Sequence, residues 1–153
     1  MNILGRKGLS YIFKIILQCI LIGGIIILIT LPLCLKWYLE FSEIYTAEYF
    51  YKTLVLFYIS GILALTILYQ SIKLLKNINK KTPFIPENPR IIHTIGLCSL
   101  LIAFLYLIAI FVIKSIFVII LFMIFVILGF MSIILSEIFR KAIEYKEEND
   151  LTI

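Results

Sequence analysis

Residues 91–138, IIHTIGLCSLLIAFLYLIAIFVIKSIFVIILFMIFVILGFMSIILSEI, decide the fold of this chain. They contain two long apolar runs, 91–113 and 116–138, which are separated only by Lys114 and Ser115. Each run has about the twenty residues that an α-helix needs to cross a hydrocarbon core about 30 Å thick. Because the connection is so short, the two helices must form a tight antiparallel hairpin.

Two further apolar runs of similar length cover residues 15–35 and 53–75. The 153 residues are 63% hydrophobic and 15% charged, whereas about a quarter of the residues in a soluble domain are charged. The sequence therefore predicts an all-α fold, a four-transmembrane-helix bundle that occupies residues 1–153 as a single integral membrane domain. No room is left for a separate catalytic or DNA-binding domain.

The Lys and Arg residues are distributed unequally between the two sides of these spans. Of the 14 in the chain, only Lys36, Lys52 and Lys114 fall in the connections after the first and third spans. The others lie before the first span, around the middle loop or after the fourth span. Because cytoplasmic segments carry the excess of Lys and Arg, both termini and the middle loop are predicted to be cytoplasmic.

The connection at residues 36–52 is rich in aromatic side chains. Trp37, Phe41, Tyr45 and Tyr49 recur every four residues, which places them near one face of a helix. The pattern predicts a short helix on the outer membrane surface, with its rings at the level of the lipid headgroups. A lid or a recognition surface for an extracellular peptide is the alternative interpretation.

The middle loop, residues 76–90, contains Pro83, Pro86 and Pro89, which prevent a continuous helix. Asn88 followed by Pro89 predicts an N-cap and a first helical residue for the third span. Pairs of small residues four apart predict close approaches between helices. These pairs are Ser60 with Ala64, Ser99 with Ala103, and Ser132 with Ser136.

The centres of all four spans lack Asp, Glu, Lys, Arg and His. Ion pumps and proton-coupled exporters need ionisable groups at that depth, so these classes are disfavoured. The three Cys residues are scattered singly, and His93 is the only histidine, which gives no ligand set for a metal. We therefore expect no catalytic residue, cofactor or metal site, and hence no enzyme activity.

The chain ends in a short cytoplasmic tail, about residues 139–153, that is predicted to continue the fourth span as a helix. Glu137 with Lys141 and Arg140 with Glu144 are four residues apart, so they can pair on a helix surface. An acidic run then gives way to Leu151, Thr152 and Ile153. The tail is interpreted either as a solvated helix end or as a docking peptide for a basic, grooved partner.

Two segments of the chain resemble the signature segments of the DUF2975 family, whose members are small four-span bacterial membrane proteins. The first segment reads Lys81-Thr82-Pro83-Phe84, then Glu87-Asn88 and Ile95-Gly96. The second reads Ser136-Glu137-Ile138-Phe139-Arg140, and it continues through Glu144 and Glu147 to Asp150-Leu151-Thr152-Ile153. The resemblance implies a multi-pass protein of the bacterial cytoplasmic membrane.

Genes of this family often lie beside one that encodes a very small helix-turn-helix regulator of the Cro/repressor type. The resemblance therefore implies a regulatory, non-enzymatic protein that binds such a cytosolic partner through its middle loop and tail, without contacting nucleic acid itself. The residues expected to carry this binding are Thr82, Pro83, Phe84, Glu87, Asn88, Glu137, Arg140, Glu144, Asp150, Leu151 and Ile153.

Two other functions remain open from the sequence. In an immunity protein against a membrane-active peptide, the outer aromatic connection would do the work and the tail would be passive. A small transporter or channel subunit fits the size of the chain but lacks charges within the membrane. The lipid bilayer is the one certain partner of such a chain, and a monomeric bundle and a dimer fit its sequence equally well.

Overall fold

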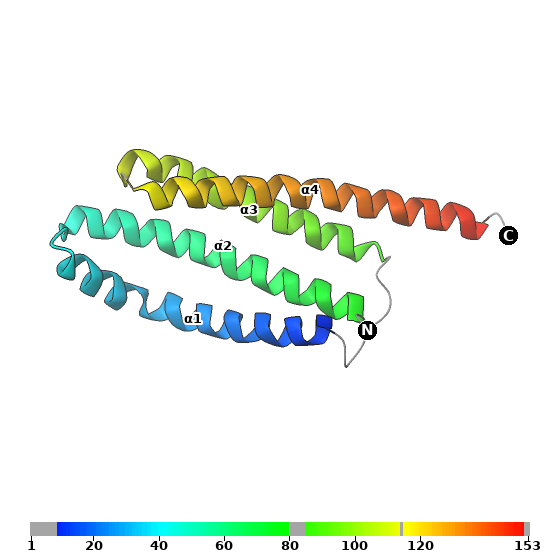
Figure 1. Cartoon of the computed structure of the whole chain (residues 1–153), viewed down its shortest axis with the longest axis horizontal. Coiled ribbons are helices and arrows are strands. Elements are labelled where there is room, and N and C mark those ends of the chain that lie inside the picture. Colours follow the sequence, from blue (N-terminus) through cyan, green and yellow to red (C-terminus); the bar gives the residue numbers. More distant parts are fainter. Residues whose placement is uncertain (1–8, 80–84, 114, 152–153) are drawn as a thin grey trace.

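The structure is a computed structural model that describes residues 9–79, 85–113 and 115–151. These residues form four long α-helices that run lengthwise beside one another (Figure 1): α1 (Leu9–Phe41), α2 (Ala47–Asn79), α3 (Glu87–Val112) and α4 (Ile116–Leu151). The described part of the chain contains no strand. Each helix is long and apolar enough to cross a membrane. The predicted all-α fold with four spans is confirmed.

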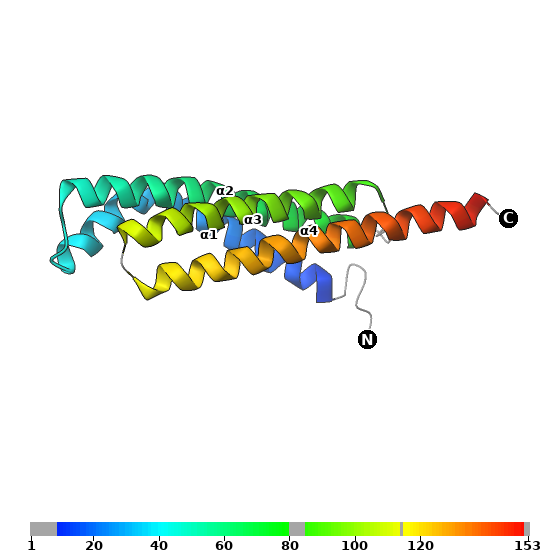
Figure 2. The same ribbon diagram turned by 90° about the horizontal axis from the view of Figure 1, so that it is seen from above.

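Each helix packs against its neighbours in the chain, so the bundle is an open row. The helix pairs in contact are α1 with α2, α2 with α3, and α3 with α4. Figure 2 shows α3 lying between α2 and α4. No Cα atom of α1 lies within 8 Å of a Cα atom of α4 along their described lengths. The row therefore has two outer helices, each with one helical neighbour and a large surface left for lipid.

The core of the molecule follows α3, because only the two middle helices have neighbours on both sides. Ile102 is almost fully buried at its centre and packs with Tyr106, Ala109 and Val118. The ring of Tyr106 stacks on that of Phe125, with 6.3 Å between the ring centroids. Most apolar side chains of α1 are exposed. In a bilayer such side chains face lipid tails, which are as apolar as a protein core.

Small residues bring α3 and α4 together, as the sequence predicts. A Cβ atom added to Gly96 would lie 2.8 Å from Ile133 Cγ1 and 3.1 Å from the Gly129 carbonyl oxygen. These distances show that the two backbones approach each other directly, which is the usual role of glycine between transmembrane helices. Four of the small residues predicted to make close contacts are buried on the same two helices, namely Ser99, Ala103, Ser132 and Ser136.

Glycines also mark the crossing of α1 and α2. A Cβ atom on Gly24 would lie 2.8 Å from Leu65, and one on Gly61 would lie 2.5 Å from Leu28. Gly23 faces open space, with no atom within 4 Å of an added Cβ. Helix α1 changes direction in its C-terminal part (Figure 1), where it contains Pro32. A proline inside a helix removes one backbone hydrogen bond and is a common cause of such bends.

The prediction of a separate surface helix at residues 36–52 is wrong. Helix α1 continues to Phe41, and α2 begins at Ala47, which leaves a short turn between them. Glu43 has a left-handed φ of 57°, and the Ile44 N–H donates to the Leu39 carbonyl over 3.2 Å. This 6→1 bond across a left-handed residue is a Schellman motif that ends α1. The four-residue aromatic pattern is therefore divided between two helices and their turn.

Candidate functional site

One end of the row is the end where α1 begins, α2 ends and α3 begins, and helix α4 projects beyond it. We refer to it as the basic end. At about 1.5 Å per residue, Lys14 and Lys36 are about 33 Å apart along α1, and Lys52 and Lys73 are about 32 Å apart along α2. These separations match a hydrocarbon core of about 30 Å. Polar groups near Lys14 and Lys73 therefore lie at the membrane boundary.

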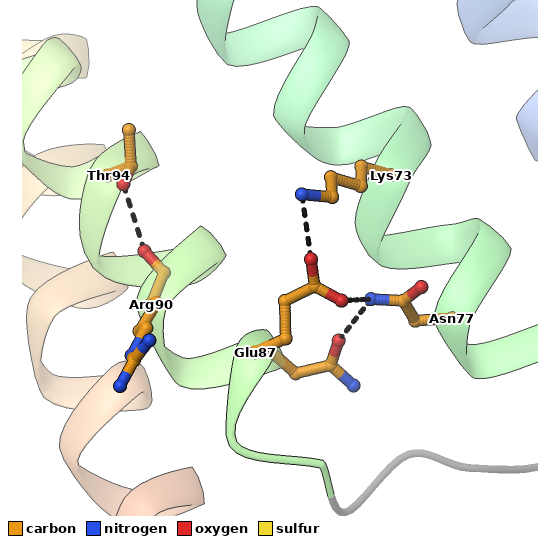
Figure 3. A network of polar contacts seen from close by, with 6 residues as sticks. Lys73, Asn77, Glu87, Arg90 and Thr94 are labelled. Carbon is orange, nitrogen blue, oxygen red and sulfur yellow. Dashed lines mark hydrogen bonds and ion pairs between the residues drawn. The ribbon is translucent and has the colours of Figure 1, made fainter.

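A polar network joins the end of α2 to the start of α3 (Figure 3). Lys73 Nζ lies 2.7 Å from Glu87 Oε1. The Asn77 amide donates to Glu87 Oε2 over 3.2 Å and to the Asn88 side-chain oxygen over 2.9 Å. Asn77 is buried and Asn88 is 0% exposed. The network thus fixes the position of the first turn of α3 against the end of α2. The hydrogen bond between the two asparagine side chains is shielded from water.

The structure corrects the predicted N-cap of the third span. Helix α3 begins at Glu87, two residues earlier than predicted, and its N-cap, Pro86, makes no side-chain capping bond. Asn88 therefore lies inside the first turn. Its side-chain oxygen accepts from Asn77 of α2 instead of from a local backbone N–H. A local pattern cannot reveal this bond, because its donor lies eleven residues away on another helix.

A second polar contact joins α3 to α4. The Ser136 hydroxyl donates to the Pro89 carbonyl oxygen over 2.8 Å, and both residues are buried. Beside this bond lies an open cavity of about 560 Å³. It is lined by Pro89, Arg90, His93, Thr94, Ile133, Ser136, Glu137 and Arg140. The first turn of α3 and the last membrane turn of α4 therefore form one polar surface, which is named the boundary cavity below.

Ion pairs follow the surface of α4 away from this cavity. Arg140 Nη2 lies 2.6 Å from Glu137 Oε1, and Arg140 Nε lies 3.9 Å from Glu144 Oε1. The predicted pair of Arg140 with Glu144 is confirmed, whereas Glu137 pairs with Arg140 rather than with Lys141. All three side chains are largely exposed, and exposed pairs contribute at most about 1 kcal/mol each. The pairs orient these side chains more than they stabilise the fold.

Helix α4 continues past the membrane boundary to Leu151, and Figure 1 shows its end projecting beyond the start of α3. The described residues of the predicted tail are helical up to residue 151. Ile143 is buried, while Glu144, Glu147 and Glu148 farther along the helix are exposed. We refer to residues 139–151 as the extension. Its acidic residues lie on a continuous helical extension of a candidate membrane span.

The predicted partner-binding residues fall into three groups. Glu87 and Asn88 belong to the network with α2, and Glu137, Arg140 and Glu144 lie on α4 beside or beyond the boundary cavity. Asp150 and Leu151 belong to the last turn of α4. Thr82, Pro83, Phe84 and Ile153 lie outside the described residues.

Lys73 and Asn77, which hold Glu87 and Asn88 in place, are not among the residues predicted from the sequence. Their spacing is the signal that could have revealed them, because residues four apart lie on one face of a helix. Among the described residues, no group of three His, Cys, Asp or Glu side chains could hold a metal ion. The basic end therefore offers hydrogen-bonding and charged groups at a membrane boundary, an arrangement suited to binding.

Comparison with known proteins gives one match. No curated protein and no solved structure matches the chain. A family model described as "Protein of unknown function (DUF2975)" matches residues 21–153. The match includes the start of α3, the boundary cavity and the extension of α4, where the signature residues lie. By this match, which leaves out only the first 20 residues, the chain belongs to the DUF2975 family.

Proposed function

We propose that this protein is a non-enzymatic regulator in the membrane, and that its basic end binds a small cytosolic helix-turn-helix transcription regulator. One observation carries the proposal. The start of α3 and the end of α4, which lie far apart in the sequence, are joined by the bond from Ser136 to Pro89 and line one cavity. The residues of α3 that line this cavity lie between the signature pairs Glu87-Asn88 and Ile95-Gly96, and its residues from α4 include Ser136, Glu137 and Arg140 of the second signature segment. The cavity is therefore a surface that borders both segments, as a binding site for one partner requires.

The charge of the extension supports a DNA-binding partner. Glu144, Glu147 and Glu148 are exposed and lie three and four residues apart, so they share one side of α4. Helix-turn-helix proteins bind the phosphate backbone of DNA through basic surfaces. An acidic helix is complementary to the same surface. A regulator bound to the extension is therefore kept from its operator DNA by competition.

The test is affinity purification of the tagged, full-length protein from its native host in mild detergent, followed by mass spectrometry. The critical variant is Glu144→Lys with Glu147→Lys and Glu148→Lys. Its matched control is Glu40→Lys with Glu43→Lys and Glu48→Lys, which reverses three exposed charges at the opposite end. We expect the wild type and the control to retain a small helix-turn-helix protein and the critical variant to lose it.

A second readout separates specific binding from charge attraction. A DNA duplex with the operator of the recovered regulator should displace it from the wild-type protein, and a duplex of scrambled sequence should do so far less. Recovery of the same proteins with the critical variant and with the wild type would contradict the proposal.

The opposite end of the molecule supports a second candidate function, protection against a membrane-active peptide. Trp37 and Phe41 are stacked with 5.8 Å between their ring centroids, and they are 69% and 77% exposed. Exposed aromatic side chains at a membrane surface are suitable contacts for an amphipathic peptide. In this case, Trp37→Ala with Phe41→Ala and Tyr45→Ala should abolish protection of cells, whereas removal of residues 144–153 should not.

A further inference from the structure

A separate cavity of about 280 Å³ lies between the first turns of α1 and the last turns of α2. It is lined by Lys14 and Gln18 from α1 and by Tyr69, Ile72, Lys73 and Lys76 from α2. We refer to it as the lysine pocket. Three ammonium groups, an amide and a phenol surround one small space, and all of these groups can donate hydrogen bonds. Such a set of donors fits an anion with several acceptor oxygens.

The lysine pocket carries an excess of positive charge. Lys73 is paired with Glu87 of α3. Lys14 and Lys76 have no ion-pair partner among the described residues, and the only acidic residue in α1, Glu40, lies at its far end. Two uncompensated ammonium groups therefore converge on the cavity. Like charges held close together beside an apolar medium repel one another, and a bound anion would relieve this repulsion.

The opposite end of the same two helices is arranged differently. Lys36 lies 3.8 Å from Glu40, and Lys52 lies 2.6 Å from Glu48, each within its own helix. The positive charges of Lys36 and Lys52 are thus each balanced by a glutamate of the same helix. The contrast shows that a lysine at the membrane boundary of this protein does not by itself create an excess of charge. It also provides a matched control for experiments.

The position of the lysine pocket indicates the source of its anion. Lys14 and Lys73 mark the membrane boundary, where phospholipid phosphates lie. Ile25 and Ile62 are seven residues from Gln18 and Tyr69, so they lie two turns deeper on the same helix faces. They are 44% and 55% exposed, and they can therefore lie against an acyl chain. A polar headgroup site continues directly into an apolar, lipid-facing surface.

We propose that the lysine pocket binds the phosphate headgroup of an anionic phospholipid, with its acyl chains against α1 and α2. Lys14 and Lys76 provide the charge, and Gln18 and Tyr69 donate hydrogen bonds to phosphate or glycerol oxygens. Basic pockets between transmembrane helices are known binding sites for anionic headgroups. This lipid would also hold α1 in place, because α2 is the only helix whose backbone approaches that of α1 in the described structure.

The experiment is native mass spectrometry of the full-length protein in detergent, titrated with equal amounts of phosphatidylglycerol and phosphatidylcholine. The critical variant is Lys14→Gln with Lys76→Gln, and the matched control is Lys36→Gln with Lys52→Gln. We expect the wild type and the control to prefer phosphatidylglycerol. In the critical variant, the ratio of phosphatidylglycerol affinity to phosphatidylcholine affinity should fall about thirtyfold. Each lysine near an anionic surface contributes about fivefold to this affinity.

A further variant and a competition measurement complete the test. Lys14→Arg with Lys76→Arg retains both charges and should restore the preference, whatever the stability of the glutamine variant. Inorganic phosphate at millimolar concentration should not displace phosphatidylglycerol. An equal loss of preference in the critical and control variants would overturn the proposal, because the effect would then be a general charge effect. Displacement of the lipid by inorganic phosphate would overturn the assignment to a lipid.

Discussion

At the scale of single residues, the basic end depends on a small number of buried polar contacts. Asn77 and Asn88 are both buried, and a 2.9 Å bond joins their side chains. A buried polar group that loses its partner keeps the cost of having been removed from water, about 1–3 kcal/mol. The two asparagines therefore favour a single arrangement of α2 and α3 over others with similar apolar contacts.

We predict that Asn77→Ala lowers the free energy of unfolding in detergent by about 1–3 kcal/mol, because the Asn88 oxygen loses this donor. The measurement is unfolding by a denaturing detergent, followed by far-UV circular dichroism. Asn149→Ala, at an exposed position on the extension, is the control and should change stability little. Equal effects of the two substitutions would show that the Asn77–Asn88 contact does not contribute to stability.

Only some residues of this network could be predicted from the sequence. Glu87 and Asn88 were found because they resemble a family motif, but their partners Lys73 and Asn77 were not. The middle loop is predicted to begin at Lys76, which places Asn77 in that loop, whereas the structure places it in the last turn of α2. Pairing between α2 and α3 is a tertiary property, and the local pattern of a single sequence does not encode it.

At the scale of helices, hydropathy predicts the spans well and their ends poorly. Three of the four predicted spans lie within α1, α2 and α4, and the run 91–113 extends one residue past Val112, where α3 ends. The helices extend farther than the apolar runs, most of all at the extension of α4. Hydropathy reports where the hydrocarbon core ends, whereas a helix ends at a cap or a proline. The Schellman motif at Glu43 is such an end, and no apolar pattern marks it.

We predict that Gly96→Ala destabilises the packing of α3 on α4, whereas Gly23→Ala does not destabilise the protein. At Gly96 the new methyl group would lie about 3 Å from backbone atoms of α4, and overpacking of this kind costs about 1–3 kcal/mol. At Gly23 it would meet nothing within 4 Å, and alanine favours a helix over glycine by about 1 kcal/mol. The same unfolding measurement distinguishes them, and equal destabilisation would contradict the close approach of α3 and α4.

At the scale of the whole molecule, the open row separates the two surfaces to which functions are proposed. The basic end carries the boundary cavity, the extension and the lysine pocket, and the opposite end carries exposed aromatic side chains. The proposed regulator is cytosolic. The proposed function therefore requires the basic end to face the cytoplasm, as the distribution of Lys and Arg predicts.

Orientation is tested by labelling cysteines in intact cells with a membrane-impermeant maleimide. The background protein has Cys19, Cys34 and Cys98 replaced by Ala. We predict that Ala47→Cys is labelled from outside, and that Asn149→Cys is labelled only after permeabilisation. Both positions are exposed, so accessibility depends on the side of the membrane. The reverse pattern would place the basic end outside and exclude a cytosolic partner.

The most direct test of the regulatory account is transcription in the native host when residues 144–153 are removed from the chromosomal copy. Insertion of the truncated protein is verified in the membrane fraction. If the extension binds a transcription regulator, the truncation should change the same transcripts, in the same direction, as deletion of the whole gene. Unchanged transcripts with normal insertion, where deletion of the gene does change them, would contradict the account.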